Sequence, residues 1–547
     1  MSDATPPTVV RRREFLKVLG VTGAATAAVG CSSDAVEKLI PYVVSPDETV
    51  PGISNYYAST CRECAASCGI IAETRDGRTI KLEGNPEHPL NRGALCARGQ
   101  AALQGLYNPD RYRTPMVRRN NRLEPATWDQ ALQLFAQRLS QLQAGGAAAN
   151  AIFINEHESG SFPGFLDQWL AAFGMPAHLS YSALAESAVM EANRRSLGVA
   201  WPSLDFGAAR LIISFGADFL DTWGASVPQQ LDYAEARARL QQAPRMVYVG
   251  ARRSLTGLNA DDWIPCRPGG ELAIINALRG TMTAAQAAQA SDVPAEIIGR
   301  LASEFAATRP SMVLAGATGP NATEIALAVN ALNQSAGNVG VTIRTDRAIT
   351  AFEGSVPAAT IANVVARMRA GQVPLFMVRG SNPAFTLPPS VGFADAMARV
   401  QFKVSFSSYP DETSELCDLI LPDHHPLEAW GTAQPVPGVI SLQQPTMDPV
   451  FQTRQTGDVL IQVARIDPTT AGRYPVPSYR EWLMGQYPGG MAAFTSALAS
   501  GIGNGSIARP ASPEAAQPPA SAAALSQGDF HVVTYPSSAL GAGAGAN

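Results

Sequence analysis

Short, continuous apolar runs recur along the middle of the chain and alternate with Ala-rich segments of helical character. Most of these runs end in Gly, Asn, Ser or Pro. A strand that is apolar along its whole length is covered on both faces, so this alternation predicts parallel sheets flanked by helices. The runs cover residues 151–155, 210–218, 245–253, 311–320, 374–383, 402–408 and 418–422. The expected fold class is therefore α/β, with two doubly wound regions over residues 116–310 and 311–450. A helix beginning after Thr127 is expected from the apolar spacing of residues 127–142.

The turns after three of these runs are candidates for a ligand cleft. They read FGADF, VGARRS and VRGSNP. In open parallel sheets, ligands bind beyond the carboxyl ends of the strands, which is where such turns lie. Each turn taken alone is explained as well, or better, by the need to close a βα unit. The pattern therefore predicts a cleft only when the turns are considered together.

Four cysteines near the N-terminus form the most specific pattern in the chain. Cys61, Cys64 and Cys68 lie within eight residues, and Cys96 follows 28 positions after Cys68. Four thiolates hold an iron–sulfur cluster, and three ligands on one loop with a fourth farther along suit a cube. Four thiolates also satisfy tetrahedral zinc, although structural zinc sites usually show two separated pairs. Two disulfides are the remaining alternative in an exported protein. We expect an iron–sulfur domain over residues 55–115.

Residues 1–31 have the features of an export signal. Three arginines, Arg11 to Arg13, precede Phe15-Leu16-Lys17 and a short run rich in Ala and Gly. This arrangement resembles a twin-arginine signal, which exports proteins already folded. The run ends at Cys31, in the context of a lipoprotein cleavage site, so Cys31 is the expected lipidation residue. We predict a lipid-anchored protein on the periplasmic face of the cytoplasmic membrane.

The charge, the hydropathy and the remaining cysteines and histidines of the chain point to no further class of site. The net charge of −5 gives no reason to expect nucleic-acid binding. No stretch after the signal is long and apolar enough to predict a spanning helix. Cys266 and Cys417 lie in apolar contexts and are expected to be buried, inert thiols. The pair His424-His425 is interpreted as part of a turn, and no Cys-x-x-Cys-His haem motif occurs.

The last part of the chain has a different character. Residues 500–528 are rich in Pro, Ala and Ser and are expected to be a linker. Residues 529–537 have the pattern of one further strand. We interpret residues 529–547 as the start of an incomplete, β-rich C-terminal domain.

Several motifs together resemble the molybdopterin oxidoreductases of the dimethyl sulfoxide reductase superfamily. They are CRECAASCG (61–69), EGNPEHPLNRGALCARGQ (83–100), LYNPDRYRTPM (106–116), CRPGGE (266–271), VRGSNP and CDLILPDHHPLEAWGT (417–432). The resemblance implies a small N-terminal [4Fe-4S] domain followed by two Rossmann-like domains. It implies that Arg98 lies on an electron path, and that the turns with Gly216, Asp218, Arg267, Gly269 and Asn382 line a pterin-nucleotide cleft.

Two departures from this family pattern bear on catalysis. Catalytic members supply a side chain that ligates molybdenum, and by alignment Ala185 stands in that position. A methyl group cannot ligate a metal. Gly250 stands where relatives usually have the Asp of an Asp-Pro-Arg turn. Molybdopterin guanine dinucleotide is therefore possible in principle but is not the expected cofactor, and the five cleft residues, together with Arg98 on the electron path, are interpreted as vestigial.

Within the superfamily, the chain most resembles the molybdopterin-oxidoreductase-like B subunit of alternative complex III. The signal, LIPYVVSPDETVPG (39–52) and YASTCRECAASCG (57–69) carry this resemblance. It implies an electron-transfer subunit of a membrane-bound quinol oxidoreductase. The implied partners are a ferredoxin-like multi-cluster subunit, a quinol-oxidising membrane subunit and cytochrome c subunits. The alternatives are a catalytic molybdenum or tungsten subunit of the polysulfide or thiosulfate reductase type, and a redox-inert subunit with zinc in the cysteine site.

Overall fold

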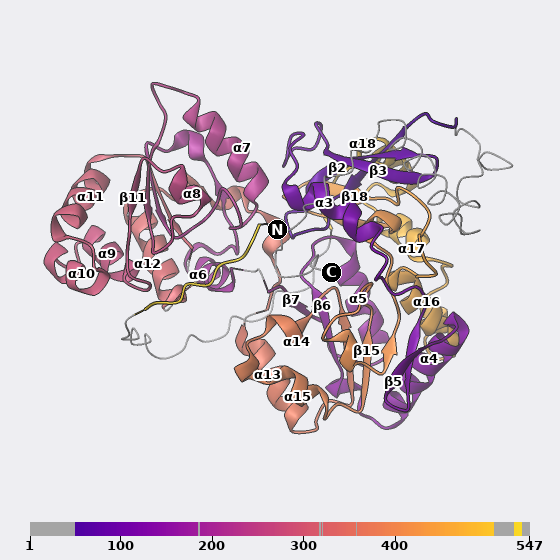
Figure 1. Ribbon diagram of the computed structural model, residues 1–547. Coiled ribbons are helices and arrows are strands. Elements are labelled where there is room, and N and C mark those ends of the chain that lie inside the picture. The colour runs from indigo at the N-terminus through magenta and orange to yellow at the C-terminus, as the bar shows by residue number, and fades with distance from the viewer. Residues whose placement is uncertain are drawn as a thin grey trace, which may run out of the picture. The chain divides into compact units, whose positions relative to one another are not determined.

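The computed structural model describes residues 50–183, 186–316, 319, 321–356, 358–507 and 530–538. Residues 56–547 belong to one structural unit, to which the following description applies. The described strands form two larger sheets, each flanked by helices, and three smaller sheets, whose elements are labelled in Figure 1. The expected fold class, an iron–sulfur domain followed by α/β regions, is confirmed.

The iron–sulfur domain is built on a three-stranded sheet with the order β1-β2-β3. Strands β2 and β3 pair in antiparallel register from Ile70 opposite Gly84 to Arg75 opposite Arg78. The helix α3 follows and begins directly after Cys96. The elements are β1 (Asn55–Thr60), β2 (Gly69–Arg75), β3 (Arg78–Gly84) and α3 (Ala97–Leu106).

The first α/β sheet is entirely parallel and has the order β11-β10-β9-β12. Every residue of the two central strands except Arg245 is buried, which explains their continuous apolar sequences. The strands are β9 (Leu211–Phe215), β10 (Arg245–Val249), β11 (Asp262–Ile264) and β12 (Ser311–Ala315). The associated helices are α6 (Ser187–Leu197), α7 (Ser226–Arg237), α8 (Leu255–Leu258), α9 (Glu271–Leu278), α10 (Ala284–Ser291), α11 (Ala295–Ala307) and α12 (Ala322–Ser335).

The second α/β sheet has seven strands in the order β5-β4-β16-β15-β14-β6-β7. The five strands from β16 to β7 are parallel, and β4 and β5 extend one edge in antiparallel orientation. The strands are β4 (Met116–Arg119), β5 (Arg122–Pro125), β6 (Ile152–Glu156), β7 (Leu179–Tyr181), β14 (Leu375–Arg379), β15 (Phe402–Ser405) and β16 (Leu419–Ile420). Both sheets therefore contain a switch point, between β9 and β12 in the first and between β6 and β14 in the second.

Helices cover both faces of the second sheet. Phe153 of β6 packs into one core with α4, α5 and α16, whereas its neighbours Ile152 and Ile154 pack into another core with α13 and α15. The predicted helix after Thr127 is confirmed, with a capping box between Thr127 and Gln130. The helices are α4 (Trp128–Ala144), α5 (Ser161–Ala172), α13 (Ala358–Arg369), α14 (Pro383–Thr386), α15 (Phe393–Met397) and α16 (Thr456–Ile466).

A third group of elements joins the C-terminal part of the chain to the iron–sulfur domain. Strand β18 pairs with β17 and β19, and the Ser59 and Thr60 hydroxyls donate to the carbonyls of Gln444 and Leu442. The elements are β17 (Gly431–Ala433), β18 (Val439–Gln443), α17 (Tyr479–Gln486), α18 (Gly490–Ser500) and β19 (Ile502–Asn504). Elsewhere, the short strands β8 (Ser203–Leu204) and β13 (Ile343–Arg344) pair with each other. Figure 1 shows β18 beside β2, β3 and α3.

Two expected boundaries and one expected strand differ from the structure. The boundary at residue 310 does not separate the two sheets, because β12 pairs with β9 while β6 pairs with β14. The first sheet is thus inserted between two segments that build the second, which apolar runs read in order cannot reveal. The linker does not begin at residue 500, because β19 extends β18. The strand expected over residues 529–537 is not present in its described part, where residues 530–536 are irregular.

Among the described residues, no helix combines the length and hydropathy needed to cross a membrane. The predicted signal over residues 1–31, with Arg11 to Arg13 and Cys31, lies outside the described residues. So do Ala185 and residues 508–529.

Candidate functional site

The loop between β1 and β2 carries three of the four cysteines. The amide of Cys61 donates to the carbonyl of Cys68 at 2.8 Å, which closes the loop at its base. Ser67 supplies the left-handed turn, with φ of 55°. Gly69 does not make that turn: a Cβ there would approach the His88 ring to within 2.6 Å, so Gly69 is needed for close packing.

The fourth cysteine reaches the loop from the start of a helix. Cys96 is the N-cap residue of α3, and its carbonyl accepts the amide of Gln100 at 3.0 Å. All four cysteines are free thiols, with Cys61 and Cys68 buried. The disulfide alternative is therefore not present in this structure.

Three of the four thiols have raised pKa values, and other cysteines contribute to each shift. Burial raises the pKa of Cys68, and the nearby Cys64 and Cys96 raise it further. Burial also raises the pKa of Cys61, with Cys68 and Cys64 adding to the effect. Four thiols gathered in such a setting suit a cationic iron–sulfur core, which stabilises thiolates. In the described part of the chain, no three His, Cys, Asp or Glu side chains are arranged to hold a single metal ion.

Arg98 lies in the first turn of α3, beside the cysteine loop. Its positive charge acts to lower the pKa of Cys64 and of Glu63, although burial raises both pKa values overall. It also acts on Asp221, which follows β9 in the first α/β sheet. The structure therefore places Arg98 within electrostatic reach of both the cysteine loop and the first sheet edge.

The first sheet edge is formed by the turns after β9, β10 and β12. Gly216 ends β9 with φ of +75°, and a Cβ at Gly316 would come within 2.2 Å of the Gly216 carbonyl oxygen. Backbone thus packs against backbone at this switch point. Asp218 is buried; its carboxylate pairs with Arg252 at 2.9 Å and accepts the Thr256 amide at 2.9 Å. We call these turns the first edge.

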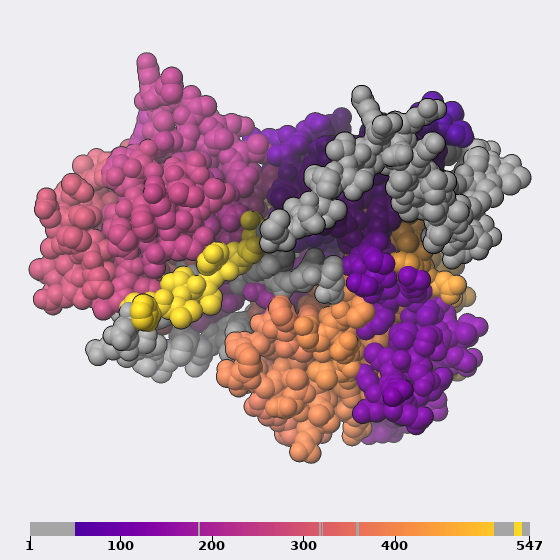
Figure 2. All heavy atoms as spheres, in the orientation of Figure 1, coloured from indigo at the N-terminus to yellow at the C-terminus, as the bar shows by residue number. Residues whose placement is uncertain are grey.

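A distant segment of the chain covers part of the first edge. The Arg252 guanidinium lies 3.9 Å from the centre of the Tyr535 ring, in cation–π geometry. Asp221 forms a side-chain hydrogen bond with Ser538, which acts to lower its pKa against the larger effect of burial. Figure 2 shows this segment, in yellow, lying along the surface of the first α/β region.

The second sheet edge carries a buried chain of charges. Arg379, at the end of β14, pairs with Glu158 at 2.6 Å and with Asp423 at 2.9 Å. Glu158 follows β6 and also accepts the Asn155 side-chain amide at 2.9 Å. Arg62, from the cysteine loop, forms an ion pair with the other oxygen of Glu158. We call Arg62, Glu158, Arg379 and Asp423 the second-edge network.

Burial and the charges of the network shift the pKa values of Glu158 and of the nearby Glu156 in opposite directions. Burial alone would raise the pKa of Glu158, but Arg379 and Arg62 outweigh it and hold that pKa below its usual value. Burial raises the pKa of Glu156 to about 7. A Cβ at Gly380 would come within 2.8 Å of the Glu156 carboxylate, so this acid fills the space over the Gly380 turn.

The remaining predicted cleft residues are engaged within the fold. The Asn382 side chain donates to Glu412 at 2.6 Å and accepts the Thr413 hydroxyl at 2.7 Å. Arg267 donates to the Ala290 carbonyl at 2.7 Å, beside α10. Gly269 turns the chain into α9 with φ of +84°. Gly216, Asp218, Arg267 and Gly269 therefore belong to the first α/β region and Asn382 to the second.

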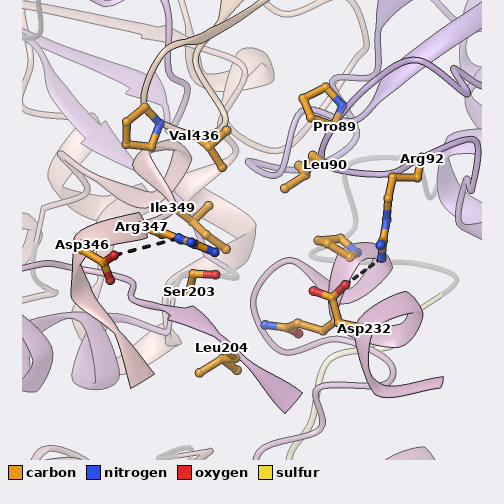
Figure 3. A pocket seen from close by; sticks show the side chains of 13 residues that line it. Pro89, Leu90, Arg92, Ser203, Leu204, Asp232, Asp346, Arg347, Ile349 and Val436 are labelled. Carbon is orange, nitrogen blue, oxygen red and sulfur yellow. Dashed lines mark hydrogen bonds and ion pairs between the residues drawn. The ribbon is translucent and has the colours of Figure 1, made fainter. Parts of the chain in front are cut away.

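A separate cavity lies away from both edges. Its volume is about 520 Å³, and Pro89, Leu90, Arg92, Asp232 and Arg347 are among the residues that line it. Figure 3 shows Arg92 paired with Asp232 on one side and Arg347 beside Asp346 on the other. None of the predicted cleft residues lines this cavity.

The remaining cysteines agree with their sequence interpretation, and the histidine pair leads into a helical turn. Cys266 and Cys417 are buried, and burial raises the pKa of both thiols well above the usual value. His425 caps a single helical turn, and burial lowers its pKa to about 3. His424 and His425 lie in the irregular segment that leads into this single helical turn.

Comparison with known proteins identifies the family. The model of the molybdopterin oxidoreductase family matches residues 111–466, and the model of its Fe4S4 domain matches residues 54–108. The chain belongs to the molybdopterin oxidoreductase family. The Fe4S4 domain match, which includes all four cysteines, supports a [4Fe-4S] cluster in this member of the family.

Individual relatives are distant. The chain is 26% identical to the menaquinone reductase, molybdopterin-binding-like subunit of Nitratidesulfovibrio vulgaris, over 82% of this chain and 71% of that protein. It is 26% identical to the thiosulfate reductase molybdopterin-containing subunit of Salmonella typhimurium, over 56% of this chain and 43% of that protein. Acetylene hydratase from Pelobacter acetylenicus shares the fold, with a TM-score of 0.64, 14% identity and coverage of 78% of this chain and 71% of that chain.

Sequence reasoning missed the second-edge network. Arg379 lies in the VRGSNP turn that was singled out, yet only the Gly, Ser, Asn and Pro of that turn were considered. Charged residues directly after an apolar strand, as in NEHE (155–158), were an available signal. The partnership with Arg62 had no local signal, because it joins positions 96 residues apart.

Proposed function

We propose that this chain is an iron–sulfur electron-transfer subunit, without a molybdenum cofactor of its own, of a membrane-bound quinol oxidoreductase of the alternative complex III type. Cys61, Cys64, Cys68 and Cys96 would hold one [4Fe-4S] cluster, which accepts and donates single electrons. Arg98 would lie on the path between this cluster and the first edge.

One observation carries the proposal: the cysteine quartet is intact, while Asp218, Asn382 and the charged side chains of the second-edge network have partners within the chain. Asp218 is held by Arg252 and Thr256, and Asn382 by Glu412 and Thr413. A pterin nucleotide carries anionic phosphates, which arginine side chains commonly bind. Both guanidiniums of the second-edge network, Arg62 and Arg379, are already bound by the carboxylates of Glu158 and Asp423. This network therefore offers no unpaired guanidinium to such a group.

The name of the menaquinone reductase relative, a molybdopterin-binding-like subunit, supports the same assignment. By analogy we propose a ferredoxin-like multi-cluster subunit, a quinol-oxidising membrane subunit and cytochrome c subunits as partners.

The second candidate is a catalytic molybdenum or tungsten subunit. The match to a thiosulfate reductase molybdopterin-containing subunit over 56% of this chain favours it. Metal analysis separates the two candidates, using protein expressed in a host that makes the pterin cofactor and purified anaerobically. We expect about four iron atoms per chain, the content of one cubane, and no molybdenum or tungsten. Molybdenum or tungsten near one atom per chain, with extractable pterin, would establish the catalytic candidate instead, and zinc without iron would exclude both.

We also propose export by the twin-arginine route and anchoring through Cys31 on the periplasmic face. Replacing Arg12 and Arg13 with Lys should leave the protein in the cytoplasm. Mass spectrometry of the mature N-terminus should find acyl chains on Cys31 that are absent from Cys31→Ala. Normal export of the double-Lys variant would contradict the route, and an unacylated Cys31 would contradict the anchor only.

A further inference from the structure

The second-edge network occupies the position where a doubly wound sheet binds its ligand. The switch point of the second sheet lies between β6 and β14. Glu158 follows β6, Arg379 ends β14, and Asp423 follows β16. The side chains at this point are therefore bound to one another, and the chain of ion pairs runs along the edge from β6 to β16.

Arg62 connects this edge to the cysteine loop. It lies between Cys61 and Cys64, and its side chain is only 13% exposed, while that of Glu158 is 6% exposed. A guanidinium is rarely buried without a partner, because leaving water is costly for a charge. The ion pair with Glu158 is the interaction that compensates Arg62, so the position of the loop and the position of Glu158 depend on each other.

Glu158 itself is held rigidly. Arg379 binds one carboxylate oxygen at 2.6 Å, and Asn155 binds the same oxygen at 2.9 Å, which leaves the other oxygen for Arg62. Arg379 is fixed in turn by Asp423 at 2.9 Å and lies 4.2 Å from the centre of the Phe162 ring. A carboxylate held by three donors on a buried sheet edge has little freedom to follow the loop. The sheet therefore positions the loop.

We propose that Glu158 is a positioning residue of the iron–sulfur centre, which acts through Arg62 to hold the Cys61–Cys64 segment on the second sheet and to set the charge around the cluster. The inference rests on the proposed [4Fe-4S] cluster. The two guanidiniums of the network balance the carboxylates of Glu158 and Asp423. Removing the charge of Glu158 leaves one uncompensated positive charge beside the cluster. Because reduction adds an electron, that charge favours the reduced state.

The test is a redox titration of the full-length holoprotein, followed by the electron paramagnetic resonance of the reduced cluster. Glu158→Gln should raise the midpoint potential and lower the iron retained per chain. Arg62→Gln should lower the midpoint potential, whereas Arg62→Lys keeps the charge and should restore the wild-type value. In the Arg62→Gln background, the effect of Glu158→Gln on iron retention should disappear, because its route to the loop is already cut.

Glu428→Gln is the matched control. Glu428 forms a fully buried ion pair with Arg111 at 2.7 Å, so the substitution has the same chemistry, but its ion-pair partner is not a residue of the cysteine loop. It should weaken the fold and leave the midpoint potential unchanged. An equal shift in Glu428→Gln, or no shift in Glu158→Gln, would overturn the inference.

The remaining outcomes are also decisive. If Glu158→Gln does not fold, Arg62→Gln alone decides, and an unchanged potential in that variant overturns the inference. A wild-type protein with no cubane signal refutes the proposed function and the inference together. A wild-type cubane signal combined with unresponsive variants refutes the inference alone.

Discussion

The two α/β regions differ in what occupies the switch point of their sheets. At the first edge, the switch point is closed by backbone, with Gly316 packed on the Gly216 carbonyl. Its one buried acid, Asp218, is bound by Arg252 and Thr256. At the second edge, the switch point holds a network of four charged side chains that extends to the cysteine loop. Both edges keep their turn motifs, yet neither motif by itself determines whether a ligand can bind, because that depends on which atoms already have partners.

The two edges also differ in what they contact and in how deeply those contacts are buried. The first edge interacts with residues 530–538 through Arg252 and Asp221, at partly exposed positions. The second edge interacts with the proposed electron-transfer centre through buried charges. Disturbing the second edge should therefore cost more stability than disturbing the first, and the following substitutions test that order.

The largest effect is expected at the centre of the second edge. Arg379→Ala would leave Glu158 and Asp423 without their shared guanidinium, and breaking a buried ion pair from one side costs about 3–5 kcal/mol. Urea denaturation monitored by tryptophan fluorescence measures the loss in free energy of unfolding. Arg237→Ala, which removes a partly exposed pair with Asp261, should cost less than about 1 kcal/mol. Equal losses in both variants would remove the distinction between the network and an ordinary surface pair.

A pH-dependent effect should appear at Glu156, beside the network. Its pKa rises from 4.5 in the unfolded chain to about 7 in the fold, because burial disfavours the charged form. The groups acting on it are Arg62, Glu158, Arg379 and Glu63. The folded state holds this proton more tightly, so the contribution of Glu156 to stability is complete below pH 4.5 and is lost as pH rises through 7.

Glu156→Gln removes this dependence. Relative to the wild type, the variant should gain stability as pH increases from 5 to 8, with a total change approaching about 3 kcal/mol. Denaturant titrations at a series of pH values measure the difference. Parallel pH profiles for wild type and variant would contradict a buried, protonated Glu156.

A smaller effect is expected at the first edge. Asp218→Asn keeps an oxygen to accept the Thr256 amide but loses the charge that pairs with Arg252. Because Arg252 is 30% exposed, the expected loss is about 1–2 kcal/mol. The midpoint potential of the cluster should change less than in Glu158→Gln. If the midpoint potential shifts more in Asp218→Asn than in Glu158→Gln, the first edge rather than the second acts on the cluster.

The smallest effect is expected at Tyr535. Replacing it with Ala removes the ring that stacks on Arg252, a contact that contributes about 0.5–1 kcal/mol at an exposed site. Limited proteolysis should cut the 530–538 segment faster in this variant than in wild type, with the stability of the remainder unchanged. Equal cleavage rates would show that the segment is held by other contacts.

The sequence alone determined the class of fold and the position of the thiols. Continuous apolar runs that end in Gly, Asn or Ser force buried parallel strands, and the structure contains them. The three-plus-one spacing of Cys61, Cys64, Cys68 and Cys96 predicted a loop carrying three thiols, which is a local feature, whereas the helix start at Cys96 came from the structure. Thr127 predicted a helix start, because capping involves residues only three positions apart.

Tertiary structure alone decided how the strands are shared and what fills the two edges. The pairing of β6 with β14 joins Ile154 to Val378, and no periodic pattern encodes a partner so distant in the chain. Arg62, Glu158 and Asp423 come from three separate segments, and each by itself resembles an ordinary charged loop residue. They become a buried network only when the sheet brings the segments together, because the energy of a charge depends on its burial and its neighbours rather than on its position in the sequence.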